Sequence, residues 1–223
     1  MDVNAQDRTT LKKLIKNQWF FLLVVELGLA VITGIVNPRF FSISNIMNIL
    51  EQVAVLGIAS SGMTILIILG EIDISAGANI GLSSCIMAML LQGSDSSFLP
   101  VLVGISLAIG NSFLVGLTSE VFRAPSFITS LAFISVFQGI ALAITKGSFQ
   151  TIYGKFETIG MARFAQVLPL SFIISIGAYL FVHFLLSYTK FGRRIYAVGS
   201  NPAAAYLSGI SVTKTKLAGF LLN

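Results

Sequence analysis

The sequence has few charged residues, a single cysteine and a single histidine. Asp, Glu, Lys and Arg make up 10% of its 223 residues, whereas a soluble domain has about 25%. The single cysteine, Cys85, excludes an intramolecular disulfide framework, and its apolar neighbours predict a buried structural thiol. The single histidine, His183, stands beside phenylalanines, and no G-x-S-x-G motif occurs. We therefore expect neither a metal site nor an intramembrane serine protease, which needs a nucleophile and a base on facing helices.

Apolar residues dominate the rest of the sequence. They make up 55% of the chain, which includes 18 phenylalanines and has a mean hydropathy of +0.90. The 20 glycines are spread through apolar runs instead of collecting in linkers. This composition is typical of a protein embedded in a lipid bilayer. The net charge of +5 then indicates membrane topology and not affinity for nucleic acid.

The N-terminal segment has the charge pattern of a signal peptide but not its length. Its apolar run, residues 19–36, is interrupted only by Glu26 and Thr33. A signal peptide has an apolar region of about 7–15 residues followed by a small-residue cleavage site, and neither feature is present. We interpret the run as a retained first membrane span. The basic residues before it are Arg8, Lys12, Lys13 and Lys16.

Six apolar stretches approach the roughly 20 residues that a helix needs to cross a bilayer. They cover residues 18–36, 46–70, 74–92, 98–120, 126–145 and 168–188, and a seventh begins at Leu217. The sequence thus predicts an all-α, polytopic transmembrane bundle that forms a single domain over residues 1–223. In this interpretation residues 1–17 are cytoplasmic, residues 189–216 form a cytoplasmic loop, and residues 217–223 start a further span.

Basic residues set the expected orientation, because cytoplasmic loops carry the excess of Lys and Arg. With the N-terminus inside, ten basic residues lie inside and four outside. The inner ten are Arg8, Lys12, Lys13, Lys16, Arg123, Lys190, Arg193, Arg194, Lys214 and Lys216; the outer four are Arg39, Lys146, Lys155 and Arg163. We therefore predict a cytoplasmic N-terminus.

The stretch GSNPAAAYLSGISVTKTK, residues 199–216, predicts a short, well-capped helix between two apolar runs. Asn201 suits the N-cap and Pro202 the first helical position. Gly209 suits a left-handed C-cap. A helix of about two turns cannot span a membrane and is marginal in water unless it packs against something. From these residues alone, two readings stay open: a segment on the membrane surface beside anionic headgroups, or a docking element for a cytoplasmic protein.

The same stretch resembles the cytoplasmic loop of permease subunits of bacterial ABC sugar importers, the family of the ribose, xylose, galactose and autoinducer-2 permeases. The family pattern is approximately G-R-x-x-Y-A-x-G-x-N-x-x-A-A-x-x-S-G-I-x-V. The residues that meet it are Gly192, Arg193, Tyr196, Ala197, Gly199, Asn201, Ala204, Ala205, Ser208, Gly209, Ile210 and Val212. The stretch from Gly199 to Val212, which includes Pro202, is similar to the family's ATPase-coupling helix, and the residues expected to couple to the ATPase are those from Gly199 to Ile210.

Two further motifs carry the resemblance, which extends from about residue 37 to residue 223. GMTILIILGEIDISAGANIGL is similar to the family's G-M-T-x-V-x-x-x-G-G-I-D-L-S-x-G, and the matching residues include Gly70, Asp73, Ser75 and Gly77. It departs at Glu71, where the family commonly has glycine, and at Ile74. APSFITSLAFISVFQGIAL is more weakly similar to P-x-F-I-x-T-L, with Ser130 in place of threonine.

The resemblance implies a permease that works with other proteins in the inner membrane. Its expected partners are a cytoplasmic ABC ATPase, an extracytoplasmic sugar-binding protein, a second permease subunit in a homo- or heterodimer, and the lipid bilayer. ATP and Mg²⁺ would be bound by the ATPase and no cofactor by this chain, because the chain lacks the G-x-x-x-x-G-K-[ST] loop: Gly154-Lys155 is followed by Phe156.

Polar residues inside a membrane are functional candidates by default. Four acidic residues lie in or near apolar runs: Glu26, Glu51, Glu71 and Asp73. A structural role as N-cap of the third span, helped by Ser75, is an alternative for Asp73. For a sugar path the candidates are Asn79, Asn111, Phe127 and Gln138, which offer amides and a stacking ring.

Two alternatives accompany this interpretation. A secondary transporter also uses broken helices and isolated acidic residues, but it leaves the coupling-helix motif unexplained. A truncated, non-transporting homologue or fragment is the other alternative, because permeases of this family are longer, and we expect that the 223-residue chain alone does not transport.

Overall fold

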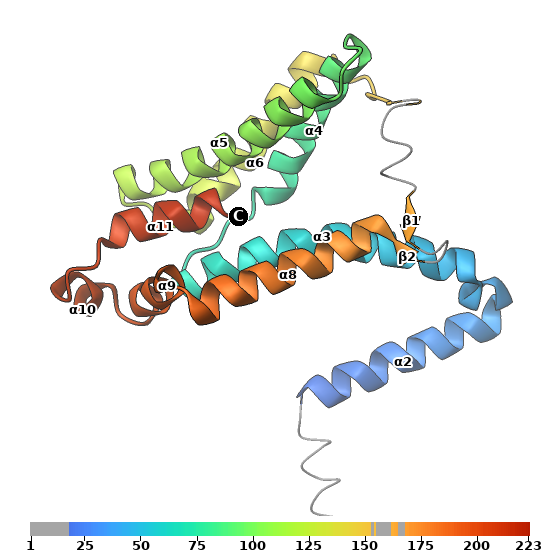
Figure 1. Ribbon diagram of the computed structural model, residues 1–223, viewed down its shortest axis with the longest axis horizontal. Coiled ribbons are helices and arrows are strands. Elements are labelled where there is room, and N and C mark those ends of the chain that lie inside the picture. Colours follow the sequence, from blue (N-terminus) through green and yellow to red (C-terminus); the bar gives the residue numbers. More distant parts are fainter. Residues whose placement is uncertain (1–17, 153, 155–161, 165–167) are drawn as a thin grey trace, which may run out of the picture. The chain divides into compact units, whose positions relative to one another are not determined.

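The computed structural model describes residues 18–152, 154, 162–164 and 168–223 (Figure 1). The expected cytoplasmic segment 1–17, with Arg8, Lys12, Lys13 and Lys16, lies outside the described residues, and so does Lys155. The chain divides after Leu50 into two compact units.

The first unit contains helix α2, Gln18–Val36, and the 3₁₀ helix η1, Pro38–Phe41. The turn between them is capped by Asn37, whose side chain accepts a hydrogen bond from the Arg39 amide (3.1 Å). The Phe41 ring covers Gly34 of α2, where a side chain would overlap it. Helix α3, Ile43–Leu69, begins in this unit and continues into the second.

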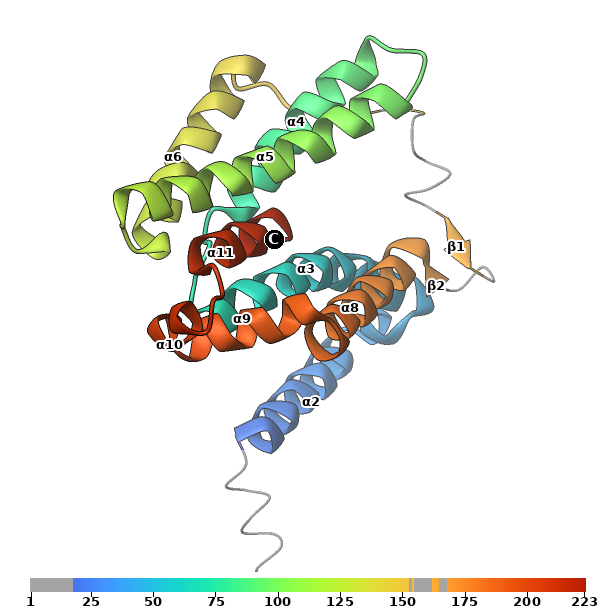
Figure 2. The ribbon, with the colours of Figure 1, turned by 60° about the vertical axis from the view of Figure 1, so that its left-hand side comes forward.

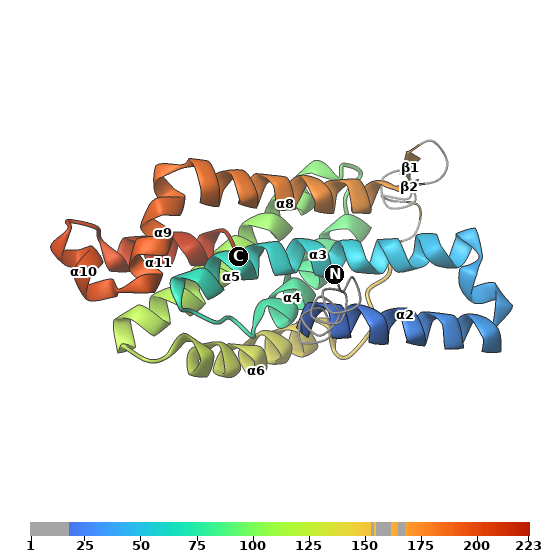
Figure 3. The ribbon, with the colours of Figure 1, turned by 90° about the horizontal axis from the view of Figure 1, so that it is seen from below.

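The second unit contains two groups of helices. The first group is α4, Ala76–Gln92, α5, Phe98–Phe122, and α6, Ser126–Thr145; α4 packs against both α5 and α6. The second group follows a two-stranded antiparallel ribbon, β1 (Arg163–Phe164) paired with β2 (Leu168–Pro169). It consists of α8, Leu170–Tyr188, α9, Lys190–Ser200, α10, Pro202–Leu207, and α11, Val212–Leu221. Figures 2 and 3 show α8 alongside α3 and α9.

The long helices confirm the predicted all-α membrane bundle. By length and composition α3, α5, α6 and α8 can each cross a membrane, and α2 (from Phe20) and α4 are shorter apolar helices. All six coincide with the apolar stretches of the sequence, although for α2 and α4 a complete span stays a prediction. Most of their large apolar side chains are exposed in the chain, as expected where lipid is the surrounding solvent.

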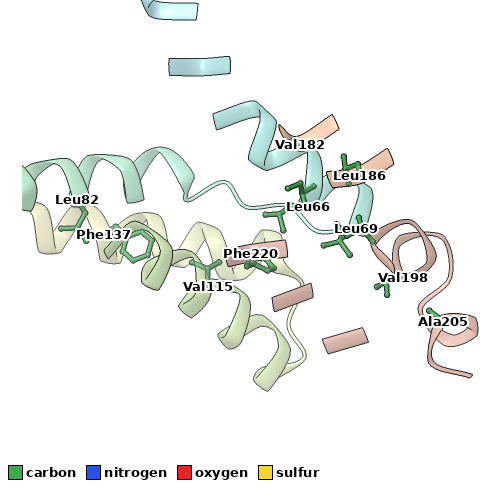
Figure 4. Close-up of a cluster of buried hydrophobic side chains, with 12 residues drawn as sticks. Leu66, Leu69, Leu82, Val115, Phe137, Val182, Leu186, Val198, Ala205 and Phe220 are labelled. Carbon is green, nitrogen blue, oxygen red and sulfur yellow. The ribbon is translucent and has the colours of Figure 1, made fainter. Parts of the chain in front are cut away.

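The core of the second unit joins the two groups of helices through α11 (Figure 4). Phe220 of α11 is buried between α5 and α3, and Gly116 of α5 leaves room for its ring. On the other side of the core, Val182 and Leu186 of α8 pack with the last turns of α3.

Candidate functional site

Helix α10 has the caps that its sequence predicts. The Asn201 side chain accepts a hydrogen bond from the Ala204 amide (3.0 Å), and Pro202 occupies the first helical position. At the other end Gly209 has φ +79°, and the Ile210 amide donates to the Ala205 carbonyl (3.0 Å). Both bonds satisfy backbone groups that a helix end leaves unpaired. The prediction of a short, capped helix is confirmed.

Helix α10 presents an apolar surface that nothing in the described chain covers. Ala205 is its buried residue, with 4% of its surface exposed. Tyr206 and Leu207 are 72% and 86% exposed. Among the other residues of the coupling motif, Asn201, Pro202, Ala204, Ser208 and Gly209 are also exposed, while Gly199 and Ile210 are half-buried. A hollow of about 450 Å³ lies beside Tyr206, between α10 and the start of α11.

The helices on both sides of α10 are anchored on the end of α3. Gly199 of α9 lies directly on the Ile68 carbonyl, and Gly219 of α11 lies on the Leu69 side chain; at either position a Cβ atom would overlap its neighbour. Ile195 and Val198 of α9 are completely buried in the same core. Gly199, which the sequence motif includes in the coupling element, lies on the side of α9 that faces α3; its part in coupling stays a prediction. An exposed short helix is therefore held between two tightly packed ones.

The end of α3 leads directly into the second motif. Gly70, with φ +79°, ends the helix: its amide donates to the Ile67 carbonyl, and the Glu71 amide donates to the Leu66 carbonyl (3.0 and 2.9 Å). This pair of bonds is a Schellman cap, which requires the left-handed conformation that glycine adopts without strain. The cap fixes where Glu71 and the residues after it lie.

Asp73 is buried, with 1% of its surface exposed. Its carboxylate accepts hydrogen bonds from the Ser75 amide (2.8 Å), the Ser75 hydroxyl (2.5 Å) and the Asn223 amide group (3.0 Å). The residue before the first helical position of α4 is Ser75 and not Asp73, so the expectation that Asp73 is the N-cap was wrong by two residues. Asp73 orders the turn that leads into α4. Gly77, in the first turn of α4, is exposed with open space above it.

Two serines of α6 form hydrogen bonds with backbone amides of the loop 70–75. The Ser126 hydroxyl accepts a hydrogen bond from the Ile72 amide (3.0 Å), and the Ser130 hydroxyl accepts one from the Ile74 amide (3.2 Å). The second and third sequence motifs therefore meet in space. Sequence reasoning noted Ser130 only as a replacement for threonine; both side chains carry a hydroxyl, and the hydroxyl is what the loop uses.

The four candidates for a sugar path do not form one cluster. The Asn79 side chain donates to the Ala108 carbonyl (2.9 Å) and accepts from Asn111 (2.9 Å) and Ser83 (3.2 Å). This network joins α4 to α5 and borders a cavity of about 200 Å³ that α3 and α11 also line. Gln138 is exposed on α6, whereas Phe127 lines a different cavity.

That larger cavity, of about 520 Å³, contains the charged residues nearest to the loop 70–75. Lys216 of α11 forms ion pairs with Glu71 (2.6 Å) and Glu120 (3.2 Å), and Arg123 lines the same cavity. Lys216 precedes the apolar residues of the expected seventh stretch. Burial removes water from the ammonium group and by itself lowers the pKa of Lys216. The hydrogen bonds with Glu71 and Glu120, and the negative charges of these two residues, outweigh this effect, so the pKa is raised overall. Its ammonium group therefore stays protonated.

The remaining candidates are dispersed. Glu26 and His183 are exposed, while Glu51 and Cys85 are half-buried; the thiol expected to be buried is thus partly accessible. Within the ranges that the structure describes, no group of three or more His, Cys, Asp and Glu side chains is arranged to hold a metal ion.

Comparison with known proteins identifies the type of protein. A family model described as branched-chain amino acid transport system / permease component matches residues 45–223. The chain is 37% identical to the ribose import permease protein of Bacillus subtilis over 202 residues, which cover 86% of this chain and 62% of that protein. It is 31% identical to the xylose/arabinose import permease protein of Sulfolobus acidocaldarius (91% and 58% covered). It is 28% identical to the autoinducer 2 import system permease protein of Klebsiella pneumoniae (96% and 62% covered).

The chain spans about three fifths of the length of these curated relatives. No solved structure matches it. The matched relatives are named as permease proteins of import systems, in agreement with the permease role expected from the sequence. The match with the family model covers the loop 70–75, α10 and the apolar helices between them. On this evidence the chain is a multi-pass membrane protein and belongs to this family of transport-system permease components.

Proposed function

We propose that the chain is the membrane-spanning permease part of an ABC importer that moves a monosaccharide or a related sugar across the inner membrane. Its proposed partners are a cytoplasmic ATPase, which binds ATP and Mg²⁺, an extracytoplasmic sugar-binding protein and a second permease subunit. The observation that carries the proposal is the exposed, capped α10 held between two helices packed on α3. Such an arrangement suits a docking element that transmits force to the bundle.

Helix α10 is the proposed contact with the ATPase. A helix this short needs a packing partner, and the exposed Tyr206 and Leu207 are residues that can supply a docking surface. Gly199 and Gly219 hold the adjoining helices so closely to Ile68 and Leu69 that movement of α10 is passed to the end of α3. In the same proposal this end of the bundle and the N-terminus are cytoplasmic, in keeping with the exposed Lys190, Arg193 and Arg194 of α9.

A pair of matched substitutions tests the docking site. Leu207→Asp changes an apolar side chain that is 86% exposed, so the bundle itself has little to lose. Phe149→Asp makes the same change at a side chain that is 98% exposed, in the loop after α6, which is predicted to lie on the other side of the membrane. We expect the candidate ATPase to co-purify with the Phe149 variant and not with the Leu207 variant. Equal retention by both variants would contradict docking through α10.

The sugar class is supported by the relatives that are named as sugar import permeases, whereas the family description names branched-chain amino acids. Uptake assays on cells that lack the gene distinguish the two classes. We expect loss of uptake of one labelled sugar among ribose, xylose, arabinose and glucose, with leucine uptake unchanged. Loss of leucine uptake alone would contradict the sugar class.

A further inference from the structure

Three charged side chains from separate elements meet at one end of the second unit. Lys216 comes from α11, Glu120 from the last turn of α5, and Glu71 from the cap of α3. Each side chain is largely buried, and Lys216 Nζ lies 2.6 Å from Glu71 Oε1 and 3.2 Å from Glu120 Oε1. In a chain with only 10% charged residues, such a group is a costly feature unless every charge is paired.

One ammonium group is shared by two carboxylates here, so the three side chains together carry a net charge of −1. While Lys216 stays in place, it attracts the loop after α3 and the end of α5 to α11. If α11 moves away, Glu71 and Glu120 remain as like charges in a partly desolvated cavity and repel each other. The ion pairs thus favour one docked position of α11 and disfavour small displacements from it.

Asn223, two residues after the end of α11, holds the loop 70–75 at a second point. Asn223 donates to the buried Asp73 (3.0 Å), two residues after Glu71. Asn223 lies outside α11, which ends at Leu221, but follows it directly in the chain. Rotation or translation of α11 therefore acts on Glu71 and Asp73 together.

The chain connects α11 directly to α10. Four residues, 208–211, separate the two helices, and Gly209 and Ile210 in this link form the C-cap of α10. Lys216 lies about one turn into α11 from its first residue, Val212. Its ion pairs with Glu71 and Glu120 therefore lie close along the chain to the C-terminal end of α10.

We propose that Lys216 is a positioning residue that passes movement of α10 to the loop around Asp73 through its ion pairs with Glu71 and Glu120. The proposal rests on the proposed function. The family motif commonly has glycine where this chain has Glu71. The ion pair between Lys216 and Glu71 therefore depends on a residue that the motif does not supply.

Lys214 provides the matched control, since it is an exposed lysine in the same helix two residues before Lys216. In the complete transporter with its ATPase and binding protein, Lys216→Met is expected to retain the ATPase. It is expected to import roughly tenfold less sugar per ATP hydrolysed, as loss of a charged hydrogen bond implies. Lys216→Arg restores the ratio and Lys214→Met leaves it unchanged. Because Lys216 acts through Glu71, the double variant Glu71→Gln with Lys216→Met is no worse than Lys216→Met.

The proposal is overturned if the Lys216→Met variant imports as much sugar per ATP hydrolysed as the wild type. It is also overturned if Lys214→Met lowers this ratio as much as Lys216→Met does. Hydrogen exchange of the amides in residues 70–75 separates this failure from failure of the proposed function. If no ABC ATPase co-purifies with the wild-type chain, the proposed function fails. In that event, faster exchange in the Lys216 variant alone supports its positioning role, and unchanged exchange overturns it.

Discussion

Replacement of Gly199 by alanine tests how tightly α9 is fixed to α3. A Cβ atom at this position would overlap the Ile68 carbonyl oxygen and lie 2.9 Å from the carbonyl carbon and 3.3 Å from Leu69 Cα. These neighbours are backbone atoms and cannot rotate away, so α9 has to move. Overpacking typically costs about 1–3 kcal/mol, and contact with backbone belongs at the upper end.

Two opposing contributions give the expected size of the effect. Alanine gains about 0.5–1 kcal/mol over glycine inside a helix, which leaves a net loss of about 2 kcal/mol for Gly199→Ala. For a chain of this size, that corresponds to a fall in Tm of about 4–8 °C. Gly177→Ala in α8 is the control, because a Cβ atom there meets open space; its Tm is expected to rise by about 1–4 °C.

Thermal unfolding of the purified variants in detergent measures both effects. The two glycine-to-alanine changes are expected to shift Tm in opposite directions. An unchanged or higher Tm for Gly199→Ala would refute the close packing of α9 on α3, and with it the rigid anchoring of α10.

Three further substitutions test other contacts. Phe220→Ala removes a side chain that is buried in the core (1% exposed) and is expected to lower the free energy of unfolding by about 3–5 kcal/mol. Phe149→Ala, at a 98% exposed position, is expected to change it little, and denaturation curves measure both effects. Asn201→Ala removes the N-cap of α10, at a cost of about 0.5–2 kcal/mol, and is expected to speed hydrogen exchange of the Ala204 amide. Asn201→Asp retains a capping oxygen, so equal exchange rates in the two variants would contradict the role of Asn201 as the cap. Ser130→Ala leaves the Ile74 amide without its acceptor and is expected to destabilise the protein by about 1–3 kcal/mol in the same denaturation assay. Ser130→Thr keeps the hydroxyl and is expected to have wild-type stability. An alanine variant as stable as the wild type would contradict the contact.

The long helices could be predicted from the sequence because apolar length alone determines them in a membrane protein. The ends of α2, α5, α6 and α8 lie within two residues of the predicted stretches. The caps of α10 could also be predicted, because asparagine, proline and glycine have strong preferences for the helix-end positions that Asn201, Pro202 and Gly209 occupy. The start of α11 was missed by five residues: it begins at Val212 and not at Leu217.

Helix α9 was not predicted, although its sequence carries a signal. Its apolar residues Phe191, Ile195 and Val198 recur at helical spacing, but the basic residues between them and Gly192 made the segment look like a loop. Thr189 caps it by accepting a hydrogen bond from the Gly192 amide (3.0 Å). An amphipathic helix at the end of a membrane span has too few apolar residues to be found by hydropathy alone.

The contacts of the site could not be predicted, because they join residues far apart in the sequence. Ser126 and Ser130 bind amides more than fifty residues earlier, and Lys216 pairs with Glu71 and Glu120. Charge counting placed Lys216 on the cytoplasmic side but could not give its partners. Asn79 and Asn111 were expected near a sugar path, and the structure joins them to each other; their role toward a sugar stays a prediction.

The most direct test of the central claim is photo-crosslinking from position 207 in the cells that encode the protein. A photoreactive amino acid replaces Leu207, with a second variant carrying it at Phe149 as the control, and mass spectrometry identifies the crosslinked protein. The account predicts that position 207, and not position 149, captures an ATP-hydrolysing ABC subunit. Capture of lipid alone from position 207, with the ATPase expressed and the protein folded, would contradict α10 as the docking element.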